Sequence, residues 1–140
     1  LGITAAMKGF CREFSEKQHA EIDFKNNNVP GSLPPDISLC LFRVLQESLH
    51  NSVKHSGAES FVVRLWGSSN EICLSVKDSG TGFDSETVVK DSHGIGLISM
   101  EERLAIVNGT LYIDSHPNTG TTIYARVPLN AERESLPATG

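Results

Sequence analysis

Apolar residues recur along the chain with two different periods, which predict helices and strands. At residues 1–17 the apolar side chains are three or four positions apart, the spacing of one helix face, and residues 36–55 and 94–107 repeat this spacing. We therefore predict three helices, the last of which opens at Gly94 and ends at Asn108-Gly109, because glycine tolerates a left-handed cap. The three apolar stripes are Ile3, Met7, Phe10 and Phe14; Phe42, Leu45, Leu49 and Val53; and Leu97, Met100, Leu104 and Val107.

Five other segments alternate apolar and polar residues, which is the pattern of strands that bury one face. The linker Gly67-Ser68-Ser69-Asn70 joins two of them as a hairpin. The order of helix, strand, helix, two strands, helix and two strands predicts an α+β fold, a two-layer sandwich with helices on one face of a mixed, mostly antiparallel sheet. The predicted strands lie at residues 20–25, 61–65, 72–76, 111–114 and 121–129.

Composition and charge narrow the class of protein. The 140 residues fit one domain, and 39% hydrophobic with 21% charged residues is ordinary for a soluble globular protein. The net charge is −5 and Lys and Arg form no block, so we expect no nucleic-acid partner. Cys11, Cys40 and Cys73 include no CxxC pair, which favours reduced thiols in a cytosolic protein over a disulfide framework or a zinc site. No apolar run approaches the ~18 residues of a membrane span.

The segment Asp78-Ser79-Gly80-Thr81-Gly82 follows a predicted strand directly and could bind a nucleotide base. A carboxylate at this place can accept a hydrogen bond from the exocyclic amine of adenine, whereas guanine presents a carbonyl there. Gly80 and Gly82 allow the backbone to approach a flat ring without a clashing Cβ. Taken alone, an Asp-Gly turn that merely ends a strand is the more frequent explanation.

The segment Gly94-Ile95-Gly96-Leu97 opens the third predicted helix, after a polar loop at residues 83–93 that we expect to act as a lid. The free N–H groups at the start of a helix, together with its dipole, favour phosphate. Ser99 replaces the third glycine of a dinucleotide-binding fingerprint, and no strand precedes the motif, which counts against a Rossmann domain. A flexible joint between loop and helix is again the more frequent explanation of this motif alone.

Three polar residues of the second predicted helix, Glu47, Asn51 and Lys54, fall on the face opposite its apolar stripe. The amide oxygen of Asn51 suits a hard cation such as Mg²⁺ that is already shared with phosphates. Glu47 can polarise a nucleophile or orient a ligand water. Lys54 can meet a phosphate oxygen, although an ordinary solvated helix face accounts for it equally simply.

The three elements occur in a fixed order, and together they closely resemble the ATP-binding catalytic domain of bacterial sensor histidine kinases. This domain belongs to the Bergerat-fold (GHKL) group, with gyrase, mismatch-repair ATPases and heat-shock chaperones. Residues 46–56 (QESLHNSVKHS) look like its Asn box, residues 78–83 (DSGTGF) like its first glycine box, and residues 94–104 (GIGLISMEERL) like its second. The similarity covers about residues 37–129, and its MEER element and short lid are most like those of nitrate-sensing and membrane-fluidity-sensing kinases.

The resemblance implies roles for individual residues, with ATP and Mg²⁺ as cofactors. It implies that Glu47 is the acid/base residue, that Asn51 binds Mg²⁺ and that Asp78 recognises adenine. Thr121 is implied to lie near the base and to contact it through a water molecule. The other residues implied to line the nucleotide site are Lys54, Gly80, Gly82, Gly94, Gly96 and Leu97.

The resemblance also implies how the chain is divided and what its partners are. We expect residues 1–19 to be a remnant of a helical dimerisation and phosphoacceptor hairpin, residues 20–129 to be the ATP-binding catalytic domain, and residues 130–140 to be a flexible tail. No histidine lies in a segment like the family's acceptor, so we expect a monomeric chain, inactive in autophosphorylation, that phosphorylates a separate hairpin. A response-regulator receiver domain is the expected downstream partner. We expect a homodimeric parent protein and a cytoplasmic location. A cytoplasmic part of a membrane-bound sensor is an alternative that stays open.

Two other functions are compatible with the same motifs. A Ser/Thr kinase of the anti-sigma-factor type uses the same boxes, but the MEER element and the opening helix favour the histidine-kinase branch. A non-catalytic ATP sensor or an ATP-gated clamp would use binding only to drive association. The short lid disfavours the clamp, and the presence of both Glu47 and Asn51 weighs against the sensor.

Overall fold

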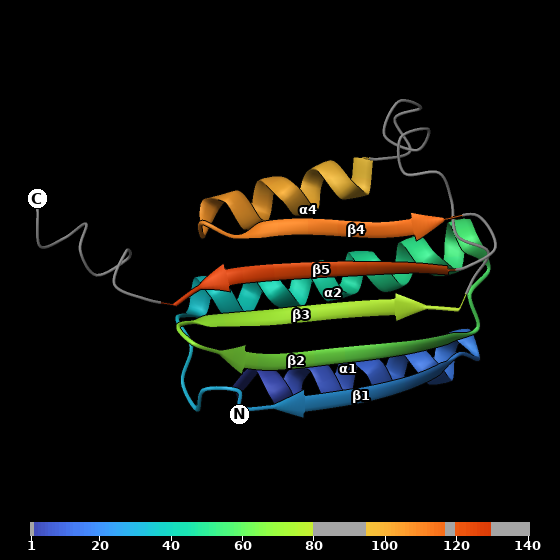
Figure 1. The fold of residues 1–140 in the computed structure, drawn as a ribbon. Helices are drawn as coiled ribbons and strands as arrows, with labels where there is room; N and C mark the ends of the chain where they lie inside the picture. Colours follow the sequence, from blue (N-terminus) through green and yellow to red (C-terminus); the bar gives the residue numbers. More distant parts are fainter. Residues whose placement is uncertain (1, 80–94, 117–119, 130–140) are drawn as a thin grey trace, which may run out of the picture.

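The computed structural model describes residues 2–79, 95–116 and 120–129, and its elements follow the predicted order (Figure 1). The predicted helices and strands are confirmed in type, with ends that differ by a few residues. The helices are α1 (Gly2–Gln18), α2 (Pro35–Ser56) and α4 (Ile95–Ile106). The strands are β1 (Glu21–Asn27), β2 (Ser60–Ser68), β3 (Glu71–Asp78), β4 (Thr110–His116) and β5 (Gly120–Pro128).

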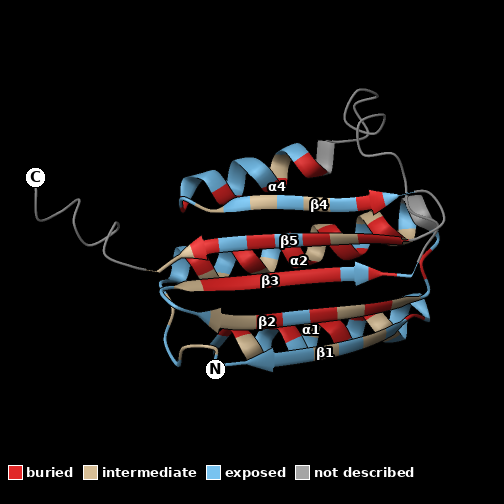
Figure 2. Ribbon diagram, in the orientation of Figure 1, coloured by how far each residue is buried: buried red, intermediate tan, exposed pale blue. Residues whose placement is uncertain are grey.

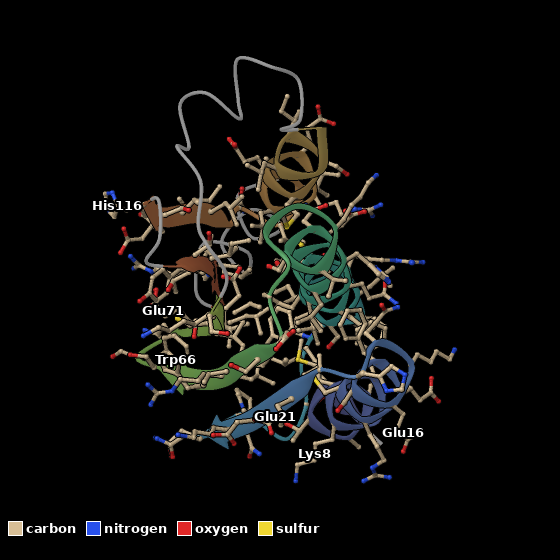
Figure 3. All side chains as sticks on the ribbon, turned by 90° about the vertical axis from the view of Figure 1, so that its right-hand side faces the viewer. Lys8, Glu16, Glu21, Trp66, Glu71 and His116 are labelled. Carbon is tan, nitrogen blue, oxygen red and sulfur yellow. The ribbon has the colours of Figure 1, made fainter. Side chains whose placement is uncertain are left out.

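The described strands form one sheet in the order β1-β2-β3-β5-β4. β1 runs parallel to β2, and every other neighbouring pair is antiparallel. The predicted β2–β3 hairpin turns at Ser69-Asn70, where Asn70 has a φ of 62°, a left-handed value that asparagine tolerates. The three helices lie on one face of the sheet, as the side view in Figure 3 makes clear. The predicted two-layer α+β sandwich with a mixed sheet is therefore confirmed.

The core lies between the sheet and the helices, and its centre is β3. Figure 2 shows β3 buried along most of its length, whereas β1 at the edge of the sheet is largely exposed. Alternate residues of a strand face opposite sides, so Ile72, Leu74 and Val76 all point into the helical layer. They share one apolar cluster with Leu45 and Leu49 of α2, in which none of these five side chains is more than 2% exposed.

The first helix, α1, is integrated into this core. Its buried residues are Ile3, Met7, Cys11 and Phe14, the predicted stripe with Cys11 in place of Phe10. Phe10 is half-buried and meets Phe42 of α2 edge to face, with ring centroids 5.5 Å apart. Phe14 meets Phe61 of β2 at 6.3 Å. Whether residues 1–19 derive from a phosphoacceptor hairpin stays a prediction, but α1 packs here with the same core as α2 and the sheet.

The end of α4 corrects one detail of the sequence analysis. Asn108, with a φ of 62°, adopts the left-handed conformation that we expected of Gly109. Gly109 is needed for a different reason, because a Cβ there would lie 2.9 Å from the backbone oxygen of Arg126 and 2.9 Å from the Leu104 side chain. The tight approach of chain segments selects this glycine, and asparagine supplies the turn.

Replacement of Met7 tests whether α1 unfolds with the rest of the domain. Met7 is fully buried, so Met7→Ala should lower the free energy of unfolding by about 2–5 kcal/mol, measured by urea denaturation. The exposed neighbour Lys8 provides the control, and Lys8→Ala should change the free energy by less than about 0.5 kcal/mol. If both variants lower the free energy of unfolding equally little, α1 does not unfold cooperatively with the rest of the domain.

Candidate functional site

On the three adjacent strands β3, β5 and β4, the helix-facing side is apolar except at one end, where each strand carries a polar residue. These residues are Asp78 of β3, Thr121 of β5 and Ser115 of β4, which we call the polar row. Each is only 4–7% exposed. Thr121 stands opposite Ser115 in the sheet register and donates its backbone N–H to Asp78. The apolar residues of the same face are Ile72, Leu74 and Val76 on β3, Ile123, Ala125 and Val127 on β5, and Leu111 and Ile113 on β4.

Asp78 is the charged member of the polar row, and neutral donors hold its carboxylate from two sides. Oδ1 accepts the backbone N–H of Thr121 at 3.1 Å, and Oδ2 accepts the hydroxyl of Ser52 in α2 at 2.7 Å. A buried carboxylate is costly unless hydrogen-bonded, and these bonds offset the cost. An ionised carboxylate has about four lone-pair sites and no proton to donate, so a group held in this way presents a pure acceptor to a ligand.

Gly120 allows β5 to approach Asp78 closely enough for this contact. Its φ is 87°, and a Cβ at this position would lie 2.4 Å from the backbone oxygen of Asp78. Both the left-handed backbone and the missing space require glycine. The next residue, Thr121, is thereby brought within hydrogen-bonding distance of the carboxylate.

Glu47 and Asn51, the predicted catalytic and metal-binding residues of α2, lie beside Ser52, which contacts the rest of the site. Ser52 reaches Asp78, and Asn51, directly before it, is half-buried on the neighbouring face of the helix. Glu47 is also half-buried and lies one turn from Asn51 on the same face. Lys54 is exposed near the end of the helix. The polar face of α2 thus adjoins the polar row through Ser52.

The amino end of α4 lies at the same end of the molecule. α4 runs antiparallel to α2 (Figure 1), and the register is fixed by Ser48 Oγ, which lies 3.6 Å from Met100 Sδ. Four residues onward along α2 is Ser52, and four residues back along α4 is Gly96. The first turn of α4, with Gly96 and the buried Leu97, therefore lies near the part of α2 that holds Asn51. The outward N–H groups of such a turn favour a bound anion.

Several predicted residues lie outside the described part of the chain. These are Gly80, Gly82 and Gly94, together with the polar loop at residues 83–93 that we expected to act as a lid. The described residues that the fold gathers at one end are Glu47, Asn51, Asp78, Gly96, Leu97 and Thr121.

Two residues of the site, Ser52 and Ser115, were not predicted from the sequence. Ser48 and Ser52 are spaced four apart on the side of α2 that packs toward the sheet and α4, which was a signal that this side is not uniformly apolar. Ser115 likewise replaces an apolar residue after Leu111 and Ile113 on β4. Ser52 and Ser115 both bond other members of the site, so a polar residue within an apolar series would have identified them.

The three cysteines, all of them among the described residues, are free and buried thiols. Burial raises the pKa of the Cys11, Cys40 and Cys73 thiols to about 11, so they stay neutral near pH 7. Within the described ranges no three His, Cys, Asp or Glu side chains cluster to hold a metal ion. Among the helices described, none is long and apolar enough to cross a membrane.

A two-layer sandwich with a buried carboxylate beside the amino end of a helix has the features of a nucleotide-binding domain, and comparison with known proteins identifies its kind. Residues 37–131 match the family of histidine kinase-, DNA gyrase B- and HSP90-like ATPases, so the chain belongs to this family of ATP-binding domains. Several curated proteins that the chain resembles are histidine kinases.

Two of these relatives are similar over nearly the whole of this chain. The chain is 35% identical over 137 residues to the sensor histidine kinase MctS of Rhizobium johnstonii, covering 95% of this chain and 29% of MctS. It is 38% identical over 134 residues to the histidine-protein kinase/phosphatase DegS of Bacillus subtilis, covering 93% of this chain and 35% of DegS. The chain thus spans about a third of the length of these relatives.

A solved structure shares the fold. The histidine kinase domain of the blue-light activated kinase from Erythrobacter litoralis EL346 superposes with a TM-score of 0.73 at 18% identity, over 92% of this chain and 62% of that one. The resemblance to sensor histidine kinases drawn from the sequence is therefore confirmed at the level of family and fold.

Removal of the Ser52 hydroxyl tests how far Asp78 depends on it. Ser52→Ala leaves the buried carboxylate without one donor and should lower the free energy of unfolding by about 1–3 kcal/mol in urea denaturation at pH 7. Ser48→Ala is the matched control, because the Ser48 hydroxyl bonds a carbonyl of its own helix, that of Val44. It should cost less than about 1 kcal/mol. Equal losses would contradict a special role for Ser52.

Proposed function

We propose that the chain binds Mg·ATP and donates its γ-phosphate to a histidine on a separate helical phosphoacceptor hairpin, as the catalytic domain of a two-component sensor histidine kinase. The observation that carries the proposal is the buried carboxylate of Asp78, held by Ser52 and Thr121 at the end of the sheet beside α4. The chain's membership of an ATPase family supports the proposal that the bound nucleotide is ATP. The acceptor hairpin, the metal and the downstream partner belong to the proposal.

Asp78 is suited to recognise adenine. Its carboxylate is held as an acceptor, and the exocyclic amine of adenine is a donor. A guanine carbonyl at the same place would leave two acceptors facing each other and unpaired, which is unfavourable in a buried site. Gly80 and Gly82, two and four residues after Asp78 in the sequence, lie outside the described part of the chain, and their role in leaving room for a flat ring stays a prediction from the sequence.

The phosphates are expected toward α4 and the polar face of α2. Asn51 is half-buried beside this region, and its amide oxygen is a fitting ligand for Mg²⁺ that also binds phosphate oxygens. Gly96 and Leu97, with the expected contribution of Gly94, would shape the phosphate side at the start of α4. Lys54 is exposed and free to reach a phosphate as a solvated cation.

Phosphoryl transfer needs mainly positioning and charge stabilisation, which this arrangement can provide. The bound Mg²⁺ would supply neutralisation of phosphate charge. Asp78 fixes the base at one end of the nucleotide, and the amino end of α4 orients the phosphates at the other. Glu47, one turn from Asn51, accepts a hydrogen bond or proton from the attacking imidazole and so acts as the acid/base residue.

The histidines whose side chains the structure describes, His19, His50 and His116, do not have the surroundings of an acceptor presented to the site. The ring of His50 packs on Phe14 at 5.4 Å on the α1 side of α2. His116 pairs with Asp114 at 3.3 Å on the edge strand β4. His19 follows α1 in an exposed, left-handed position. We therefore place the acceptor on a separate hairpin and expect the isolated chain to be monomeric.

The parent protein is proposed to be a homodimer whose hairpin receives the phosphate and passes it to an aspartate of a response-regulator receiver domain. We propose a cytoplasmic location for this domain, whether or not the parent protein is anchored in a membrane. Residues 1–19 would then connect to the hairpin; residues 130–140, predicted from the sequence to be a tail, lie outside the described part of the chain. Similarity to the sensor histidine kinase MctS and to the histidine-protein kinase/phosphatase DegS favours this branch over a Ser/Thr kinase of the anti-sigma-factor type.

Substitution of Asp78 tests recognition of the base. Asp78→Asn keeps the shape but places an amide where a pure acceptor is expected, and it should cost about 1–3 kcal/mol of ATP affinity in calorimetric titration. Asp23→Asn, on the exposed edge strand β1, is the control and should leave the affinity unchanged. Unchanged affinity for Asp78→Asn, or wild-type binding of GTP as tight as that of ATP, would contradict the assignment.

Phosphate transfer in trans tests the catalytic role. Incubated with radiolabelled ATP and Mg²⁺, the chain alone should take up essentially no acid-labile phosphate, and the separately expressed hairpin of its parent protein should become labelled. Glu47→Ala should lower the transfer rate by about 10²–10⁴-fold with little change in ATP affinity. EDTA, or Asn51→Ala, should weaken nucleotide binding itself.

The matched control for this assay is Glu101→Ala, which removes an exposed carboxylate from α4 and should leave the rate unchanged. Labelling of a histidine in the isolated chain would show that the acceptor is not separate. Labelling of a partner serine instead would assign the protein to the anti-sigma-factor type.

A further inference from the structure

The face of the sheet that is turned away from the helices, which we call the outer face, carries all of the chain's tryptophan and tyrosine. Trp66, Tyr112 and Tyr124 are the one tryptophan and the two tyrosines of the sequence, and each alternates along its strand with residues of the core. Trp66 is half-buried and lies on this face in Figure 3, whereas Tyr112 and Tyr124 are 49% and 41% exposed. The described phenylalanines, by contrast, all belong to the core or pack against it.

The residues of the outer face form a continuous row across the described strands. In the sheet register the row runs through Lys25, Arg64, Ser75, Tyr124 and Tyr112. Neighbouring strands are about 4.8 Å apart, so the row is about 19 Å long, which suits a polypeptide better than a small molecule. Tryptophan, tyrosine and arginine are also the residues enriched at the centre of protein–protein interfaces.

Two cations stand side by side at one end of this row. Lys25 and Arg64 are direct register partners on β1 and β2, and like charges across neighbouring strands repel each other. Lys25 has a weak ion pair with Asp23 of its own strand, at 3.6 Å, in which the side chains are 59% and 60% exposed. Among the described residues no carboxylate forms an ion pair with Arg64, and Glu71 is bonded to Arg126 instead. A carboxylate from another molecule would offset the repulsion.

A hollow of about 320 Å³ adjoins the two cations on β1 and β2. Its lining residues are Lys25, Asn26, Asn27, Arg64, Leu65 and Trp66. The donors of Arg64 form a planar fork that matches a carboxylate, and the indole of Trp66 offers apolar surface beside it. An acidic side chain and an apolar neighbour from one polypeptide therefore fit this hollow together. Nucleic acid is a poorer match, because the chain has a net charge of −5 and no basic stripe.

We propose that the outer face is a docking surface for an acidic segment of another polypeptide. Carboxylates of the partner bind Arg64 and Lys25, and its apolar groups cover Trp66 and the two tyrosines. Asp78 lies on the opposite face of the sheet and pairs with the start of β2, whereas Arg64 and Trp66 stand toward the end of that strand. The docking surface is therefore separate from the proposed ATP site and does not depend on nucleotide binding.

The fluorescence of Trp66 tests this inference on the whole chain, because no other tryptophan contributes to the signal. The probe is a glutamate peptide with one central leucine, about six residues long, which spans the row when it is extended. The same peptide with glutamine in place of glutamate is the uncharged comparison. Arg64→Gln removes the cation, and Arg12→Gln, an exposed position on α1, is the matched control. Thermal unfolding and ATP titration verify that each variant is folded.

The glutamate peptide should change the Trp66 fluorescence saturably, and the glutamine peptide should bind about 10-fold more weakly, because it lacks the charge-assisted hydrogen bonds. Arg64→Gln should weaken binding of the glutamate peptide by a similar factor of about 10 and leave the affinity for ATP unchanged. Arg12→Gln should behave as the wild type in both titrations. Added salt should weaken binding of the glutamate peptide, because it screens exposed charges.

The inference would be overturned by lack of saturation up to about 1 mM peptide, by equal binding of the two peptides or by equal losses for the two arginine variants. Tighter binding of an oligothymidylate would assign the outer face to nucleic acid and would also contradict the proposal. So would dimers in sedimentation whose formation alone changes the Trp66 fluorescence, since a second copy would then cover this face. A wild-type chain that binds the glutamate peptide but no ATP would overturn the proposed function only.

Discussion

The buried carboxylate of Asp78 is the interaction on which the rest of the site depends. It joins β3 to Ser52, 26 residues earlier, and to Thr121, 43 residues later. Left without donors, a carboxylate that is 4% exposed would carry a large desolvation cost, so α2 and β5 must stay in place around it. The same two bonds fix the carboxylate as an acceptor. One feature therefore stabilises the local fold and defines what the site can recognise.

The directions of the strands and helices explain why the polar residues of the candidate site lie at one end of the sheet. Because β5 is antiparallel to both β3 and β4, the last residues of β3 and β4 and the first residues of β5 lie at the same end of the sheet. The antiparallel packing of α2 and α4 brings the polar end of one helix to the amino end of the other (Figure 1). The resulting site has a side suited to a base, at Asp78, and a side suited to phosphates, at Asn51 and Gly96.

Much of the fold and part of the candidate site could be predicted from the local pattern of apolar and polar residues. Apolar periods of two and about 3.6 residues reflect burial of one face, which is a local property, and they predicted the type and order of every described element. Glu47, Asn51 and Asp78 were chosen as candidate site residues because each stands in a recognisable motif on the expected kind of element, and their roles stay predictions. The exchange of roles between Asn108 and Gly109 was missed, because the close contact of Gly109 with Arg126 comes from a strand distant in the sequence.

The secondary structure, the family and the residue types available for nucleotide binding follow from the sequence alone. Which of these residues meet depends on how the strands and helices pack. Ser52 and Ser115 are unremarkable serines in the sequence, and they become part of the site because α2 crosses the end of β3 and because β5 lies between β3 and β4. Such contacts depend on strand order and helix packing, which arise from the whole core, so no local pattern of residues encodes them.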